Sequence, residues 1–354
     1  MDTRLHGLIP AIVTPFRTDL RLDERVFTRY VEKVVSSGIS AIAVNTDAGE
    51  GQFLLQEERE RVLSLVKKTV SGRIPVVCGL GGVNTMQVLE HARRFQDLGT
   101  DFFLVFPQPA FRGATGKDRA IISYHESLVR IGVPLIIFHL QEALGGVFYP
   151  AETIAELAQM DGVVAIKEAT FDALIYRNAV DLLSSAKRRI SILTGNDNFI
   201  IESFLLGADG ALIGFGSIFT DIQAKAINLA RKQRYREAFA LFARIEEICR
   251  FCFKPPVRDY RARIKEVLVA QGVFQNALVR APLLPVVASE RRQIRKILNH
   301  IDIKLPGAVK KKLAGRMGRI LWQRKTLHWK RFTAIIHTIQ FLMILRALSF
   351  ALSV

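Results

Sequence analysis

The segment VVAIKEA, residues 163–169, is the stretch from which the fold can be worked out. Its apolar residues are small or β-branched, and they form a continuous run, which is typical of a strand covered on both faces. The run ends in Lys167, and Glu168 follows directly. A lysine in this place is either a rim charge that pairs with a carboxylate such as Glu168 or Glu50, or an amine held for chemistry.

Seven further apolar runs precede or follow this one before residue 220. They are LIPAIVTPF (8–16), SAIAVN (40–45), IPVVCGL (74–80), DFFLVF (101–106), PLIIFHL (134–140), ISILTGN (190–196) and GALIGFG (210–216). Stretches such as LDERVFTRYVEKVVSSG lie between them, with apolar residues at helical spacing. Eight strand–helix alternations in about 220 residues predict the α/β class and a (β/α)8 barrel. The competing architecture, an open doubly wound sheet, lacks support because no G-x-G-x-x-G follows the first run.

The pattern changes after the eighth run. We expect residues 1–220 to form the barrel and residues 221–303 a C-terminal helical region packed on it. QAKAINLARKQRYREAFALFARIEEICRFC would supply two of its helices and DYRARIKEVLVAQG another. The segment FKPPVRD (253–259) separates two of these helices, because consecutive prolines cannot continue one. A C-terminal helical appendage on a barrel is therefore predicted.

The net charge of +17 comes mainly from the tail, residues 304–354, which has eleven Lys or Arg and no acidic residue. Without these the net charge is about +6, so the main domain shows no sign of nucleic-acid binding. We expect the tail to be helical or partly disordered. Its last part, 332–354, is apolar and long enough to span a membrane, yet Arg346 lies near its middle. Membrane contact there stays an alternative to packing on the domain or on a partner.

The three cysteines exclude a disulfide framework. Cys249 and Cys252 form one C-x-x-C in EAFALFARIEEICRFCF, which is typical of an amphipathic helix, so we interpret them as structural. The sequence has no cluster with the spacing of metal ligands. It also has no secretory signal pattern, so a cytoplasmic location is expected, with peripheral membrane association through the tail as an alternative.

The carboxyl ends of the strands and the loops after them form the active face of a parallel barrel. Lys167 is the only lysine at these predicted strand ends. Loss of hydration at the mouth of an apolar barrel disfavours the charged form of a lysine and lowers its pKa. The neutral amine is then a nucleophile that can form a Schiff base with a carbonyl compound. On the pattern alone, this role and the rim ion pair both remain open.

Several motifs resemble, in order and spacing, the dihydrodipicolinate synthase / N-acetylneuraminate lyase family. They are LIPAIVTPF, AGEGQFLLQEERERV, IPVVCGLGGVNTMQVLEHARRFQDLGTDFFLVFPQPAF, VVAIKEATFD and LTGNDNFIIESFLLGADGALIG. The resemblance covers roughly residues 5–295. It implies a (β/α)8 barrel with a C-terminal helical domain, a homo-oligomer (tetramer or dimer), no cofactor, and a Schiff-base lysine on the sixth strand. Lys167 falls on that lysine.

Other site positions of the family differ here. The family's tyrosine at the end of strand five, which relays protons, aligns with Phe138, which has no titratable group. His139 is adjacent, but strand alternation sends it to the other face. The arginine that synthases use for the second substrate aligns with Ala143, and the pair at 108–109, QP, stands where synthases place another tyrosine of the relay.

The family's carboxylate-binding motif after strand two is also altered. In NTDAGE, Asp47 and Ala48 take the places of the hydroxyl residues. The side chain of Asp47 would repel a carboxylate, unless it serves as a loop cap that bonds its own backbone. Thr46 is a candidate for proton transfer and substrate binding, and Leu212 matches an apolar position that lines the keto-acid site.

The sequence therefore favours a class I, imine-forming lyase or aldolase that acts on a 2-keto acid, an aldehyde or a related carbonyl compound through Lys167. The departures put the synthase reaction itself in question more than the fold. One alternative is a catalytically weak or inactive barrel that binds a small molecule or serves as a scaffold. Another is a membrane-attached or anionic-partner-binding protein whose tail carries the function.

Overall fold

The structure is a computed structural model that describes residues 5–301. Its strands are β1 (Gly7–Pro10), β2 (Ile42–Val44), β3 (Val76–Leu80), β4 (Phe102–Val105), β5 (Leu135–Leu140), β6 (Val163–Ala169), β7 (Ser191–Thr194) and β8 (Gly210–Ile213). The helices between and just after them are α1 (Glu24–Val35), α2 (Gln56–Val70), α3 (Thr85–Asp97), α4 (Arg119–Val129), α5 (Ala151–Gln159), α6 (Ala173–Ser184), α7 (Ile200–Leu205) and α8 (Thr220–Arg231).

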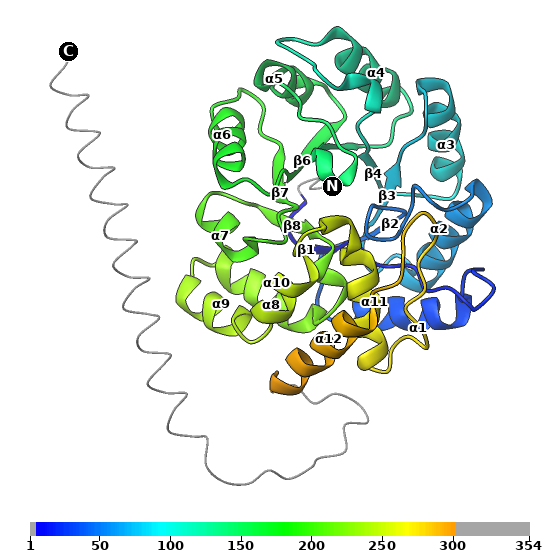
Figure 1. Ribbon diagram of the computed structural model, residues 1–354. Coiled ribbons are helices and arrows are strands. Elements are labelled where there is room, and N and C mark those ends of the chain that lie inside the picture. The colour runs from blue at the N-terminus through cyan, green and yellow to red at the C-terminus, as the bar shows by residue number, and fades with distance from the viewer. Residues whose placement is uncertain (1–4, 302–354) are drawn as a thin grey trace, which may run out of the picture. The chain divides into compact units, whose positions relative to one another are not determined.

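The eight strands form one parallel sheet in the order β1-β8-β7-β6-β5-β4-β3-β2. A parallel bridge between Ala11 and Ala43 joins the two ends of this order, so the sheet closes on itself. Figure 1 shows the strands at the centre of the molecule with helices α1 to α8 around them. Each of the eight predicted runs overlaps one strand, and the predicted (β/α)8 barrel is confirmed.

The barrel strands are buried on both faces, as their near-continuous apolar runs indicate. All strand residues are buried except Val164, which is partly exposed. The helices have one apolar side each. In α1, for example, Phe27, Tyr30 and Val31 are buried in the core while the charged residues face solvent. This packing fixes the strand ends, and with them the side chains at the mouth of the barrel.

Four helices follow α8: α9 (Tyr235–Phe242), α10 (Glu246–Cys252), α11 (Tyr260–Ala270) and α12 (Ala288–His300). The expectation of two helices up to Cys252 was wrong, because α8, α9 and α10 are separate. The break between α9 and α10 places both Ile245 and Ile248 in the core, fully buried. The predicted break at 253–259 is present, and it contains only a short 3-10 turn, η4 (Val257–Asp259). A C-terminal helical appendage is thus confirmed.

All described residues belong to one compact unit. Helix α8 contacts β1 and is the eighth helix of the barrel, so the predicted boundary at 220 falls at its start. The boundaries at 220 and 303 stay predictions. The tail, 304–354, with its apolar part 332–354, lies outside the described residues.

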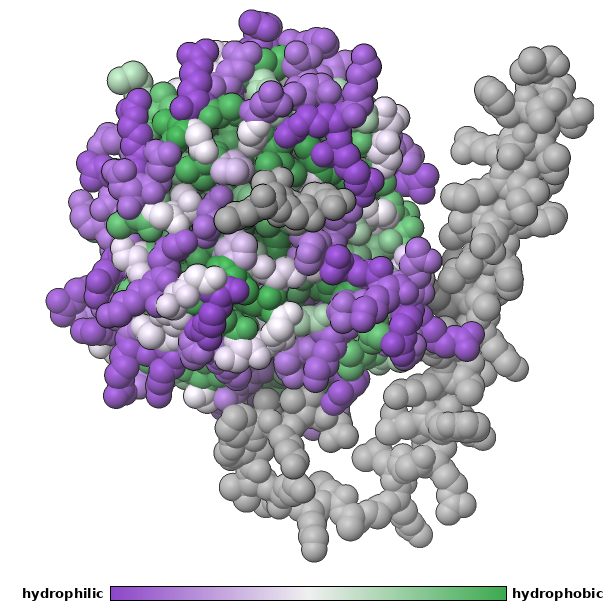
Figure 2. Space-filling view, turned by 180° about the vertical axis from the view of Figure 1, so that it is seen from behind, coloured by the Kyte–Doolittle hydropathy of each residue, from purple (hydrophilic) through white to green (hydrophobic). Residues whose placement is uncertain are grey.

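Within residues 5–301, no helix has the length and apolar character needed to cross a membrane. Figure 2 shows the side of the molecule opposite to that of Figure 1, where hydrophilic side chains form most of the rim and hydrophobic ones lie between them.

Candidate functional site

Lys167 lies at the carboxyl end of β6 and points into the mouth of the barrel. Its Nζ is 4.3 Å from the centroid of the Phe138 ring, and the two residues are register partners in β6 and β5. A side chain at Gly195, on the neighbouring β7 side, is excluded because a Cβ there would lie 2.6 Å from the Cε of Lys167. The lysine is therefore held between an aromatic face and a glycine, and only 6% of it is exposed.

Burial lowers the pKa of Lys167 from 10.5 to about 8, and the nearby charges of Asp197 and Asp47 limit that decrease. No carboxylate of the described residues pairs with Lys167 at ion-pair distance. Glu50 pairs instead with Lys265, a second fully buried lysine, and the Glu168 side chain accepts from Asn196. The rim ion pair with Glu168 or Glu50 is therefore wrong, because both carboxylates have other partners.

A small cavity adjoins Lys167. Its volume is about 20 Å³, which is enough for about one water molecule. Its polar lining consists of Asp47, Lys167, Asp197 and Tyr260, while the partly exposed Leu144 and Phe171 are among its apolar lining residues. Any molecule larger than water therefore reaches the amine only after some of these side chains move.

Asp47 is held in place by helix α11. The Tyr260 hydroxyl donates to Asp47 Oδ2 at 2.8 Å, and the Arg261 guanidinium pairs with Oδ1 and donates from Nε to the Asp47 carbonyl at 2.7 Å. A Cβ at Gly214 would lie 2.9 Å from the Tyr260 ring, so this glycine leaves room for the ring. The interpretation of Asp47 as a cap of its own backbone was wrong, because its carboxylate bonds to α11.

Sequence reasoning missed Tyr260 as a site residue. It begins α11, more than two hundred residues away from Asp47 in the chain, and burial raises its pKa well above 10. The helix buries Arg261, Arg263 and Lys265 as well, so its charges do not form a solvated face. The one signal in the sequence is the density of charges in YRARIKE without an apolar stripe.

Asp197 is the second carboxyl group of the cavity. It lies in the loop after β7, where its Oδ1 accepts a 2.8 Å hydrogen bond from the Phe215 amide. Burial raises its pKa from 3.8 to about 7, although this amide and the charge of Lys167 oppose the increase. A carboxyl group and an amine that both titrate near neutral pH thus share one cavity, which is the arrangement that proton transfer requires.

The structure brings together four of the six residues singled out from the sequence: Asp47, Ala48, Phe138 and Lys167 all line the cavity. Thr46 does not line it, and its buried hydroxyl has no hydrogen-bond partner among the described residues. Leu212 is fully buried in β8 and does not line it either. A role of these two in substrate binding stays a prediction.

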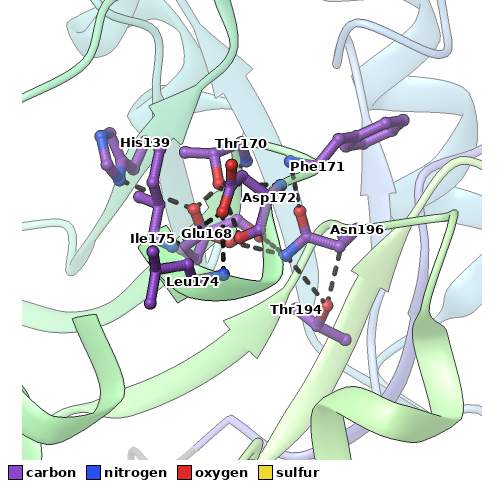
Figure 3. Close-up of polar contacts among 9 residues, drawn as sticks. All are labelled: His139, Glu168, Thr170, Phe171, Asp172, Leu174, Ile175, Thr194 and Asn196. Carbon is purple, nitrogen blue, oxygen red and sulfur yellow. Dashed lines mark hydrogen bonds and ion pairs between the residues drawn. The ribbon is translucent and has the colours of Figure 1, made fainter. Parts of the chain in front are cut away.

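His139 and Glu168 lie on the outer side of β5 and β6, in a buried polar cluster (Figure 3). The Nδ1 atom of His139 is 3.7 Å from Glu168 Oε1, and burial lowers the pKa of His139 to about 4 and raises that of Glu168 to about 7. Asn196 donates to Glu168 at 2.6 Å and accepts from the Phe171 amide at 2.6 Å. The cluster therefore fixes the loop that carries Phe171 to the cavity, and His139 does not replace the absent tyrosine.

A second cavity, of about 450 Å³, opens beside the ends of β2, β3 and β4. Asn45, Gln52, Arg59 and Gln87 are its main polar lining residues. No lysine is among the described residues that line it, whereas Lys167 lines the smaller cavity.

The other replaced positions lie near the mouth but bring no titratable group to the cavity. Ala143 lies in the exposed turn η2 (Glu142–Leu144), and the Gln108 amide donates to the Tyr124 hydroxyl at 3.3 Å. Within residues 5–301, no group of three or more His, Cys, Asp or Glu side chains could hold a metal ion. The buried Cys249 donates to the Asp197 carbonyl at 3.1 Å, which fits a structural role.

Fold and site together define a (β/α)8 barrel with a desolvated lysine at the carboxyl end of its sixth strand. Residues 4–301 match the model of the dihydrodipicolinate synthetase family. The chain belongs to this family, and it has the fold of the lyases in the family.

The chain aligns with curated relatives over nearly the whole length of those relatives. An uncharacterized DapA-like lyase from Thermofilum pendens is 25% identical over 310 residues, which cover 86% of this chain and 100% of the relative. A 4-hydroxy-tetrahydrodipicolinate synthase from Parabacteroides distasonis is 27% identical over 308 residues, with 86% and 99% covered. The level of identity is low throughout.

Solved structures share the fold. The chloride-inhibited dihydrodipicolinate synthase from Acinetobacter baumannii, complexed with pyruvate, superposes with a TM-score of 0.75 at 24% identity, covering 84% of this chain and 98% of that one. Dihydrodipicolinate synthase from Aquifex aeolicus gives a TM-score of 0.75 at 22% identity, with 85% and 100% covered.

Proposed function

We propose that the protein is an imine-forming lyase or aldolase that acts on a 2-keto acid or a related carbonyl compound through Lys167. The observation that carries this proposal is the burial of the Lys167 amine beside Phe138, which lowers its pKa to about 8. A substantial fraction of the amine is then neutral and nucleophilic near pH 8.

The chemistry follows from the lone pair on Nζ. It attacks the carbonyl carbon and forms a C–N bond, while the π electrons of the carbonyl move to its oxygen. A second step forms the C=N bond and expels that oxygen as water, which takes both hydrogens of the neutral amine. Protonation of the imine nitrogen then draws electrons toward the imine carbon. A bond at the carbon next to the imine carbon is therefore made or broken more easily.

Asp197 and the pair formed by Tyr260 and Asp47 are the proton-handling groups in this proposal. Asp197 is suited to donate to the departing oxygen because burial raises its pKa to about 7. Tyr260 stays neutral because burial raises its pKa, so it passes protons only by accepting one while donating its own to Asp47. These groups take over from the tyrosine that Phe138 replaces.

The experiment is reductive trapping. The protein is incubated with a panel of keto acids, aldehydes and ketones, reduced with cyanoborohydride, and weighed by intact mass spectrometry. We expect the wild type to carry one stable adduct per chain more than Lys167→Met carries. Exposed lysines react with aldehydes in both proteins, so Lys167→Met sets the background. The absence of an adduct above that background for the whole panel would refute the proposal.

One observation favours a second function, a barrel that binds a small molecule without turning it over. Phe138 offers no proton beside the amine, and the cavity has room for about one water molecule. In that case the trapped imine forms, but no compound of the panel is converted. We expect a homo-oligomer for either function, and size-exclusion chromatography with light scattering tests that expectation.

A further inference from the structure

We propose that the ring of Phe171 limits, by size, which compounds reach the amine of Lys167. The inference rests on the proposed function and deepens it, because it makes Phe171 the residue that selects small carbonyl compounds over branched ones. Three features of the structure carry it: the small volume of the cavity, the backbone conformation of Phe171, and the packing of its ring.

The cavity beside Lys167 is too small for any carbonyl compound. Its volume of about 20 Å³ holds about one water molecule, so an entering compound has to displace part of the wall. Of the described lining residues, only Leu144 and Phe171 are partly exposed, and the others are buried. Buried side chains are close-packed, whereas these two have solvent to move into. The entrance therefore lies at Leu144 and Phe171.

The backbone of Phe171 is held in an unfavourable conformation. Its φ angle is +61°, in the left-handed region that a residue with a Cβ rarely adopts. Asn196 Oδ1 accepts from the Phe171 amide at 2.6 Å, and Asn198 Nδ2 donates to the Phe171 carbonyl at 3.0 Å. Such a conformation persists only where the surroundings enforce it, and it is most common at functional sites. Here the loop after β7 enforces it, and the position from which the ring extends is thereby fixed.

The ring of Phe171 belongs to an aromatic row over the cavity. Figure 3 shows this side chain directed away from Glu168 and His139. Its ring centroid is 6.1 Å from that of Phe253, and the Phe253 ring stacks on Tyr260 at 4.8 Å. The three rings of this row all line the cavity, but Phe253 and Tyr260 are buried. Within the row, Phe171 is therefore the ring that can move out into solvent.

Rotation of Phe171 about its χ1 bond would move the ring outward while the backbone stays hydrogen-bonded. The space that one side chain vacates suits a compound with a short chain. A branched chain would also have to displace the buried Phe253. Apolar pockets discriminate between compounds that differ by a methylene group by a factor of about ten to two hundred, so a size limit of this kind is measurable.

The test uses Phe171→Ala and Phe199→Ala as a matched pair. Phe199 is also partly exposed and lies in the neighbouring loop after β7, but it does not line the cavity. Phe171→Gly is a second variant that removes the ring. Glycine adopts the left-handed backbone conformation without strain, so we expect this variant to fold even if Phe171→Ala does not.

The first readout is the rate of reductive trapping on Lys167 for two pairs of carbonyl compounds. Pyruvate is compared with 4-methyl-2-oxopentanoate, and acetaldehyde with 3-methylbutanal, so that each pair differs only in a methyl against an isobutyl group. Adducts are located by peptide mapping. We expect the ratio of the larger to the smaller compound to rise by about tenfold or more in Phe171→Ala and Phe171→Gly. In Phe199→Ala it should equal the wild-type ratio.

The second readout needs no imine. Cyanate is a small amine reagent and trinitrobenzenesulfonate is a bulky one, and peptide mapping gives the rate at which each modifies Lys167. We expect the ratio of the bulky to the small reagent to rise by about tenfold or more in the two Phe171 variants and to stay unchanged in Phe199→Ala.

Unchanged ratios in folded Phe171→Ala and Phe171→Gly would overturn the inference and leave the imine chemistry intact. An equal rise in Leu144→Ala would overturn the assignment of the size limit to Phe171. Where adducts form, the carbonyl ratios decide. If no carbonyl compound forms an adduct in any variant, the proposed function fails, and the amine reagents alone decide whether Phe171 limits access to Lys167.

Discussion

The hydroxyl of Tyr260 donates a 2.8 Å hydrogen bond to the carboxylate of Asp47, and this bond links helix α11 to the turn after strand β2 at the edge of the lysine cavity. The C-terminal helical region therefore contributes directly to the site instead of only covering the barrel. A hydroxyl reaches the cavity from α11, at a site where strand β5 offers only the apolar side chains of Phe138 and Leu140.

Tyr260→Phe removes this bond and keeps the ring. A hydrogen bond to a charged group contributes about 1.5–3 kcal/mol, so we expect the free energy of unfolding in urea to fall by about that amount. We also expect slower adduct formation on Lys167. Tyr149→Phe is the control, because the buried Tyr149 hydroxyl has no hydrogen-bond partner among the described residues. Equal effects of the two changes would contradict the account.

The rate of imine formation should depend on pH through Lys167. Its pKa is lowered from 10.5 to about 8, so the neutral nucleophile increases as the pH rises toward 8. The protonated form of Asp197, with a pKa of about 7, decreases over the same range, so the rate should pass through a maximum between about pH 7 and 8. Initial trapping rates from pH 6 to 10.5, with the Lys167→Met background subtracted, measure this. A rate that still climbs steeply at pH 10 would indicate an ordinary, solvated lysine.

Lys167→Met should stabilise the protein. The unfolded chain binds the lysine proton more tightly than the folded one, so the folded state carries a penalty that is complete below pH 8 and absent above pH 10.5. We expect the free energy of unfolding at pH 7 to rise by roughly 1–3 kcal/mol, since one pKa unit corresponds to about 1.4 kcal/mol. The gain should fade between pH 8 and 10.5. The exposed Lys68→Met, as a control, should change it by less than about 0.5 kcal/mol.

Phe138→Tyr returns a hydroxyl to the end of β5, close to the Lys167 amine. We expect faster adduct formation, by about tenfold or more, because a positioned proton donor typically contributes a factor of about a hundred or more. Phe106→Tyr is the control, since Phe106 packs edge-on against Phe138 but lines the larger cavity. No gain over this control would mean that the β5 hydroxyl is not what limits the reaction.

The strands could be predicted from the sequence, but the partners of the site residues could not. Runs such as VVAIKEA are continuously apolar because parallel strands are covered on both faces, and this pattern is local. The contact between Tyr260 and Asp47 joins residues 213 positions apart, and it leaves no local pattern. Helix α11 also buries Arg261 and Lys265, which form ion pairs with Asp47 and Glu50. Charged residues on a helix usually form a solvated face, so this burial could not be predicted from the helix alone.

Asp47 illustrates the same limit. The sequence placed it correctly in the turn after the second strand, where it replaces a hydroxyl residue. The hydrogen-bond and ion-pair partners of its carboxylate, Tyr260 and Arg261, come from a helix that follows the barrel. The surroundings of Asp47 thus depend on contacts that appear only in three dimensions.

The most direct test is to locate the trapped adduct by peptide mapping of the reduced protein. Lys265 is an internal control, because burial lowers its pKa to about 8 as well, but its Nζ is paired with Glu50 and donates to the Leu278 carbonyl. The account predicts a reduced adduct on Lys167 and none on Lys265. An adduct on Lys265 or on surface lysines, with Lys167 unmodified, would contradict it.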